Sequence, residues 1–118
     1  MNTKESILAL VKQVTIEAVT VKGLKDPIHV KSLTGKERDG FESACFVQKG
    51  KNRQLNTENI RSKLLVRAIC TAKGERIFTD NDIEALGNIP ADVLDKLFTV
   101  AQKLSGLAQD DIEEIAGN

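Results

Sequence analysis

The chain has 118 residues, of which 41% are apolar and 29% charged, and its 17 basic side chains balance its 17 acidic ones. This composition is that of one folded domain with its own core, and it excludes a disordered chain and a two-domain protein. Four phenylalanines are the only aromatic residues, which leaves few stacking platforms for nucleic-acid bases. We therefore expect a small interaction protein in preference to a large enzyme.

The charges are unevenly distributed along the chain. Residues 1–76 hold 15 Lys and Arg against 8 Asp and Glu, a net charge of +7. Residues 77–118 hold 2 against 9, a net charge of −7. Such an asymmetry predicts that the basic part of one copy can attract the acidic part of another. Self-association is therefore one hypothesis from the sequence.

The first segment, residues 3–14, carries apolar residues at helical spacing, with Thr3 or Asn2 available as the N-cap. This pattern predicts an N-terminal helix. Because β-branched residues are frequent from Val11 onward, the alternative is a strand that begins there. No apolar run approaches the roughly 20 residues of a membrane span, and the N-terminus lacks the apolar core of a signal peptide. We expect a cytoplasmic protein without a membrane partner.

Residues 15–33 alternate apolar and polar side chains on both sides of a turn, which predicts a β-hairpin. The turn lies at Gly23–Pro27, where glycine tolerates a positive φ and proline suits the start of a strand. The change of phase at Ala18 and Val19 suits a bulge or a strong twist. Together with the helical remainder, the hairpin predicts an α+β fold, in which an N-terminal β-hairpin packs on a mainly α-helical domain.

From Thr34 onward the apolar spacing is that of helices. Thr34 and Glu37 have the spacing of a capping box, in which each side chain accepts a hydrogen bond from the other residue's backbone N–H. The expected helices lie over residues 35–48, from Asn56 or Thr57 to Gly74, over residues 80–86 behind a Thr79 cap, and from Ile89–Pro90 to about Leu107.

The domain division follows from these elements. Residues 1–108 are expected to form a single globular domain. Residues 109–118 are acidic and lack a C-terminal stop signal, so we expect them to form a mobile tail.

Two stretches are candidate partner-binding sites. The last helix has a broader apolar face than one neighbour can cover, so part of that face belongs to the core or, alternatively, to an exposed partner groove. The basic stretch 49–54 is expected to be a loop, either a solvated connection or a contact for a phosphate or an acidic partner. The candidate residues are Val93, Leu97, Val100, Leu104 and Leu107 on the helix, and Lys49, Lys51 and Arg53 in the loop.

No arrangement of residues in the sequence supports catalysis. The single histidine, His29, lies on an alternating strand, where it is expected to point toward solvent. Cys45 and Cys70 are too widely separated to form a metal-binding pair, and both are interpreted as buried thiols. We therefore expect a protein that is not an enzyme and that has no cofactor, no metal and no catalytic residue.

One acidic stretch alternates in the way that calcium ligands do. Asp80, Asp82 and Glu84 have the right spacing, but Ala85 and Ala91 stand where a calcium loop needs glycine and glutamate. Acidic residues also stabilise the first turn of a helix. We therefore predict that this stretch caps a helix.

The hairpin and the helix start that follows it carry a resemblance. The runs Val19–Gly23 and Ile28–Arg38 resemble the opening of the small tail assembly chaperones of long-tailed bacteriophages. In that family, a strand pair that ends in a Leu-Thr-x-Lys-Glu-Arg-like run leads into an all-helical remainder. The similarity is clearest over residues 19–41 and is weakly echoed by residues 94–107.

The resemblance implies a non-enzymatic protein of the infected cell. Members of that family keep the tape-measure protein soluble until tail-tube subunits polymerise around it, and they are absent from the finished virion. In many members a frameshifted, extended form recruits the tail-tube protein. The alternatives are a small nucleic-acid-binding regulator and a structural helical subunit of a larger complex. Zero net charge and few aromatic residues count against nucleic acid as a partner.

Overall fold

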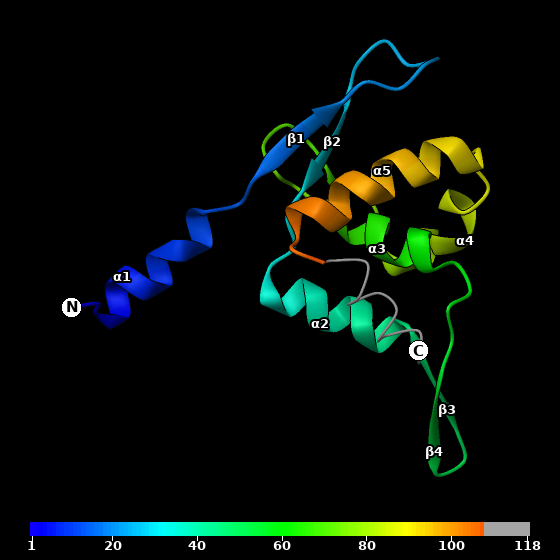
Figure 1. The fold of residues 1–118 in the computed structure, drawn as a ribbon, viewed down its shortest axis with the longest axis horizontal. Coiled ribbons are helices and arrows are strands. Elements are labelled where there is room, and N and C mark those ends of the chain that lie inside the picture. Colours follow the sequence, from blue (N-terminus) through cyan, green and yellow to red (C-terminus); the bar gives the residue numbers. More distant parts are fainter. Residues whose placement is uncertain (108–118) are drawn as a thin grey trace.

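The fold, taken from a computed structural model, is described for residues 1–107 (Figure 1). A three-stranded antiparallel sheet of order β1-β2-β5 packs against helices, and a separate two-stranded hairpin projects from the helical part. The sheet consists of β1 (Ile16–Val19), β2 (Ile28–Lys31) and β5 (Ile69–Cys70), and the second hairpin of β3 (Phe46–Lys49) and β4 (Asn52–Leu55). The predicted α+β class and the N-terminal hairpin are confirmed.

Helices make up most of the remaining chain. The first two turns are α1 (Lys4–Leu8) and the 3-10 helix η1 (Ala9–Lys12), and they precede the sheet. The others are α2 (Gly35–Ala44), α3 (Ile60–Ala68), the 3-10 helix η2 (Asp80–Asp82), α4 (Ile83–Leu86) and α5 (Ala91–Leu104). Within residues 1–107, no helix has both the length and the apolar character needed to cross a membrane.

Helix α3 lies at the centre of the molecule. Every residue from Ser62 to Cys70 is buried, and the sheet and the other helices contribute fully buried partners such as Val30, Phe41 and Leu97. Burial of one such side chain is worth roughly 1.5–3 kcal/mol. Because α3 brings its own charged residues inside, their polar atoms need partners: Arg67 donates to the backbone oxygen of Lys63 at 2.7 Å.

The predicted start signals fall where helices begin, with one exception. Thr34 with Glu37 forms the capping box of α2, and Thr79 with Asp82 forms that of η2. The exception is α3, which was expected to begin behind Asn56 or Thr57. Its N-cap is Asn59, in the left-handed conformation at φ 57°, because the side chain of Asn56 is occupied by the backbone N–H of Glu58.

The helix predicted over residues 35–48 is present but ends four residues early, and the predicted basic loop after it is wrong. Helix α2 ends at Ala44, and the next residues form the hairpin β3–β4, with Lys49 paired to Asn52 across a two-residue turn. Gly50 makes this turn possible with φ 62°, a conformation that glycine adopts at the first central position of a hairpin turn. The local preference of the apolar pair Phe46–Val47 for a strand outweighs the helical pattern.

The predicted extension of α3 to Gly74 is also wrong. The helix ends at Ala68, and Ile69 and Cys70 continue as β5, paired with Val30 and His29 of β2. Gly74 instead lies in a tight turn at φ 87°, and a Cβ there would approach Ile16 to 3.2 Å. The pattern misled because a fully buried strand has no polar side chains to break the apolar run of a buried helix.

The N-terminal hairpin is more regular than expected. Pairing runs without an extra residue from Ile16 opposite Lys31 to Val19 opposite Ile28, so the bulge suggested at Ala18 and Val19 is absent. The predicted N-terminal helix is confirmed as α1 with η1, capped by Thr3. The expected acidic tail over residues 109–118 lies outside the described residues.

Candidate partner-binding groove

A large apolar groove lies between the turn of the N-terminal hairpin, strand β5 with the connection after it, and the helices α4 and α5. Its volume is about 1010 Å³. The residues that line it are Val21, Lys22, Gly23, Leu24, Lys25, Asp26, Pro27, Ile28, His29, Ile69, Cys70, Thr71, Ile77, Phe78, Leu86, Ile89, Pro90, Val93 and Leu97.

The groove has an apolar floor and an apolar rim. Leu86 and Leu97 are buried and form part of its floor. Leu24 and Ile77 stand on its rim, and each exposes 54% of its surface to solvent. Exposed apolar side chains that gather around a concavity mark interaction sites more often than isolated ones do. A groove of this kind takes the apolar face of an amphipathic helix.

The first wall of the groove is held in place by the hairpin and by a contact to α5. Gly23 takes φ 98°, which allows the chain to reverse, and Pro27 directly precedes β2. On α5, the amine of Lys96 donates a 2.6 Å hydrogen bond to the backbone oxygen of Thr20, just before the turn. This contact ties the hairpin to α5 and so fixes the separation of two sides of the groove.

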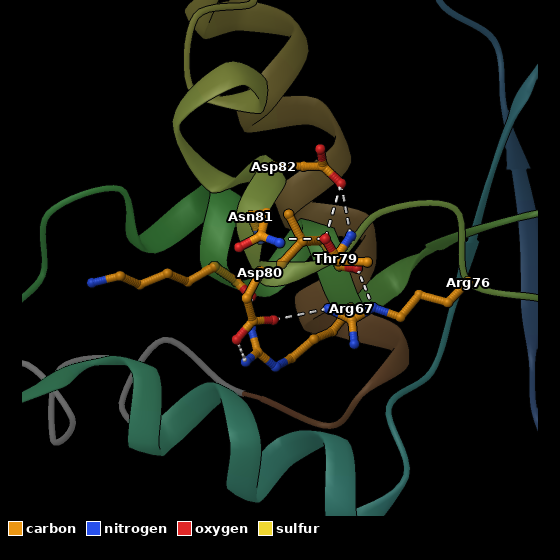
Figure 2. Close-up of polar contacts among 8 residues, drawn as sticks. Arg67, Arg76, Thr79, Asp80, Asn81 and Asp82 are labelled. Carbon is orange, nitrogen blue, oxygen red and sulfur yellow. Dashed lines mark hydrogen bonds and ion pairs between the residues drawn. The ribbon is translucent and has the colours of Figure 1, made fainter.

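The wall that carries Ile77 and Phe78 is held by a polar cluster (Figure 2). Arg67, from the buried helix α3, and Arg76, from the connection, both reach the carboxylate of Asp80, at 3.0 and 3.1 Å. Arg76 also donates to the backbone oxygen of Val66 at 2.7 Å. The two arginines therefore attach both ends of the connection to α3, and Ile77 and Phe78 lie between these attachments.

The acidic stretch serves as a helix start, as predicted. Asp82 accepts from the backbone N–H of Thr79 at 2.8 Å (Figure 2), and the hydroxyl of Thr79 accepts from the N–H of Asn81. Glu84 accepts from the side chain of Asn59, away from the other acids. Over residues 1–107, no cluster of His, Cys, Asp or Glu is arranged to hold a metal ion.

The structure divides the predicted apolar face of the last helix. Val93 and Leu97 line the groove, with Val93 partly buried and Leu97 fully buried. Val100 and Leu104 are partly buried against the core and do not line the groove, and Leu107 is 2% exposed. The face is therefore mostly core, and only its first part lines the candidate groove.

The three basic candidates lie together but far along the chain from the groove lining. Lys49, Lys51 and Arg53 are exposed on the hairpin β3–β4, which extends away from the body of the protein (Figure 1). The guanidinium of Arg53 stacks over the ring of Phe46 at 4.4 Å. Residues 46–55 contain no acidic side chain, so the hairpin presents a basic surface.

His29 is less exposed than predicted, because it is partly buried and lines the groove. Cys70, its partner across the sheet, is buried, as is Cys45. Burial raises the pKa of both thiols above the ordinary value, which keeps them protonated at neutral pH and unreactive.

Several groove residues were not among the candidates from the sequence. The most exposed are Leu24, inside a turn of polar residues, and Ile77, in the connection after β5. The one local signal for Leu24 and Ile77 is that each is a large apolar residue in a segment between regular elements, where residues are otherwise mostly polar. The remaining lining residues belong to buried elements and differ in no visible way from core residues.

Comparison with known proteins identifies a family. Neither the curated proteins nor the solved structures contain a significant match to this chain. A family model of phage tail assembly chaperones matches residues 11–117. The match covers the sheet, the groove and α2 to α5, which is most of the chain, so this protein belongs to the family of phage tail assembly chaperones.

Proposed function

We propose that this chaperone binds apolar helices of the tape-measure protein in the groove and keeps that protein soluble in the cytoplasm of the infected cell. Family membership supplies the role in tail assembly with protein partners. The observation that carries the choice of site is the groove of about 1010 Å³ with Leu24 and Ile77 exposed on its rim. Binding ends when tail-tube subunits assemble around the client, and no catalysis is involved.

The geometry of the groove suits transient binding. Covering one exposed Leu or Ile contributes roughly 1.5–3 kcal/mol, and association costs at least about 4 kcal/mol in lost freedom of motion. A few rim contacts therefore give weak binding to any one helix. A long helical client provides many such segments, and several chaperones bound along it hold it in solution while remaining exchangeable.

The proposal is tested by co-expression of the chaperone with its tape-measure protein. We expect the wild-type chain to keep the client in the soluble fraction and to co-purify with it. Leu24→Lys and Ile77→Lys, each placing a charge on the rim, should leave the chaperone folded and abolish co-purification. The matched control is Val47→Lys, which adds the same charge at a partly exposed apolar residue of the hairpin β3–β4.

Two results would contradict this assignment of the site. One is an unchanged yield of complex with both rim variants. The other is an equal loss of complex with Val47→Lys, which would place the client contact on the hairpin. The apolar residues Val100 and Leu104 and the basic residues Lys49, Lys51 and Arg53 are then the next candidates.

The charge asymmetry supports a second, electrostatic contact between copies. The basic hairpin β3–β4 and the acidic residues of η2, α4 and α5 lie on different parts of the surface, so one copy can present its hairpin to the acidic part of the next. Exposed charges are screened within about 10 Å at 0.1 M salt, so this association should weaken as salt rises. A mass by light scattering that does not change between low and high salt removes the electrostatic contact.

A further inference from the structure

We propose that the N-terminal segment α1–η1 of one copy binds in the apolar groove of a second copy. The inference uses the same groove as the proposed function, but it concerns the chaperone without its client. The family match begins at residue 11, so α1 (Lys4–Leu8) lies outside the part that the family shares. Most of the segment α1–η1 therefore precedes the matched region.

The segment α1–η1 presents an apolar face that stays exposed among the described residues 1–107. No residue of α1 or η1 is buried. Ile7, Leu8, Leu10 and Val11 expose 53%, 61%, 54% and 72% of their surface. Isolated helices shorter than about 12 residues are marginal in water, because nucleation is costly and few hydrogen bonds follow. A helix at residues 4–12 therefore needs an apolar surface to cover it.

The groove has the dimensions for this segment. A helix rises 1.5 Å per residue and is about 10 Å across with its side chains, so nine residues occupy a cylinder about 13 Å long. The groove holds about 1010 Å³. That volume accommodates the apolar half of such a helix, with the polar half left in solvent.

The segment cannot lie in the groove of its own chain. Only residues 13–15 connect η1 to β1, and three extended residues span about 10 Å. The groove opens beside the hairpin turn, beyond the far end of β1, whose four residues alone extend about 13 Å. Figure 1 shows α1 leaving the body on the side away from that turn. A second copy has no such restriction.

The charges around the groove agree with this occupant. The segment carries Lys4 and Lys12 against Glu5, a net charge of +1. Residues 80–95, which contribute the α4–α5 wall, contain five acidic side chains and no basic one. None of these five lines the groove itself, but Glu84 and Asp92 are exposed, and neither forms an ion pair with any residue among 1–107. The charged residues that line the groove are Lys22, Lys25 and Asp26, so Glu5 of the segment can face the two lysines and one of its own lysines can face Asp26.

The contact joins two different surfaces of the chain, so each copy can bind two neighbours. Each copy offers one segment and one groove, which makes the association head-to-tail and yields open chains or rings. The same groove cannot hold the segment and a client helix together. Client binding should therefore release a neighbouring copy, and the segment acts as an exchangeable cover of the groove.

The first test measures the mass of the client-free chain by sedimentation at about 0.5 M salt, where the electrostatic contact is screened. We expect the wild-type mass to rise with concentration to at least twice the 12.9 kDa of one chain. The double variant Leu8→Lys/Val11→Lys should stay at one chain. Gln13→Lys, which adds one such charge just outside the apolar face, should associate like the wild type.

The second test uses complementary variants. Ile77→Lys should be monomeric, and Leu24→Lys serves as a second groove variant should the first fail to fold. An equal mixture of Leu8→Lys/Val11→Lys with Ile77→Lys should form one-to-one dimers, because one intact segment and one intact groove remain. A monomeric wild type, wild-type mass for the segment variant, or a mixture that stays monomeric overturns the inference. None of these outcomes bears on client solubilisation, which is measured separately.

Discussion

The helix α5 and the segment α1–η1 carry the same kind of apolar pattern in opposite surroundings. In α5, Leu94, Leu97 and Ala101 are buried against α3 and the sheet. In α1–η1, the apolar residues are all exposed, and the segment extends away from the body of the protein (Figure 1). The difference teaches that apolar residues at helical spacing specify a helix and a face, but not the surface that covers the face. For α5 that surface is in the same chain, and for α1–η1 we infer that it is in another.

The largest expected difference in the free energy of unfolding is between two Leu→Ala substitutions, one in each helical segment. Leu97→Ala leaves a cavity at a fully buried position and should lower the free energy of unfolding by about 2–5 kcal/mol. Leu8→Ala removes a side chain that is 61% exposed and should change it by less than about 0.5 kcal/mol. Chemical denaturation at low protein concentration, where copies are separate, measures both values. Equal effects would show that α1–η1 packs on its own domain.

The same contrast explains how much of the fold the sequence predicts. Residues whose role is local were placed correctly: the Thr34–Glu37 and Thr79–Asp82 capping boxes and the Gly23–Pro27 turn all act within a few residues of chain. The third strand was missed because Ile69–Cys70 becomes a strand only by pairing with β2, about 40 residues earlier in the chain. Helical spacing continued through it, and no local signal marks the change.

The candidate site was predicted in part for a related reason. Val93 and Leu97 were among the candidates, since a broad apolar face is visible in the sequence. The rest of the groove comes from elements that meet only after folding, such as the turn around Leu24 and the connection at Ile77. Tertiary contacts also decide that Leu107, on the same predicted face, belongs to the core.

The ion pair between Lys31 of β2 and Glu37 of α2 should make the free energy of unfolding of the domain sensitive to acid. Burial is the largest single influence on the carboxyl of Glu37 and raises its pKa, but hydrogen bonds from Lys31 and Thr34 and the charge of Lys31 outweigh it. The net pKa lies below the ordinary value of 4.5. A lowered folded-state pKa means that this stabilisation is complete above the unfolded-state pKa and is lost as pH falls through the folded-state value.

Glu37→Gln tests that junction, because glutamine keeps the capping geometry and removes the charge. We expect a loss of about 1–2 kcal/mol at neutral pH, since buried Lys31 loses its charged partner. As pH falls from 4.5 through the lowered pKa of Glu37, the variant and the wild type should converge in their free energies of unfolding. A constant difference at all pH values would show that the charge of Glu37 contributes nothing. Asp39→Asn, at an exposed position of the same helix, is the control.

Removing a charge from the polar cluster that holds the groove wall should have a smaller effect on the free energy of unfolding. Asp80→Asn leaves the buried guanidinium of Arg67 without its carboxylate, but that carboxylate is 59% exposed and solvent already weakens the pair. We expect a loss of about 1 kcal/mol in the free energy of unfolding. Asp92→Asn, in the first turn of α5 and outside any ion pair of residues 1–107, should change it by less than about 0.5 kcal/mol.

Removal of residues 2–12 should have the smallest effect on the stability of the single domain. The deleted residues contribute nothing buried, and the first capping box and its hydrogen bonds lie entirely within them. The melting temperature at low protein concentration should therefore stay within about 2 °C of the wild type, which corresponds to a few tenths of a kcal/mol. At high concentration the wild type should melt above the truncated chain, because association stabilises the folded state by mass action and only the wild type can associate through α1–η1. Equal melting temperatures at every concentration would mean that the segment covers no groove. A lower melting temperature for the truncated chain at low concentration would mean that the segment packs on its own domain.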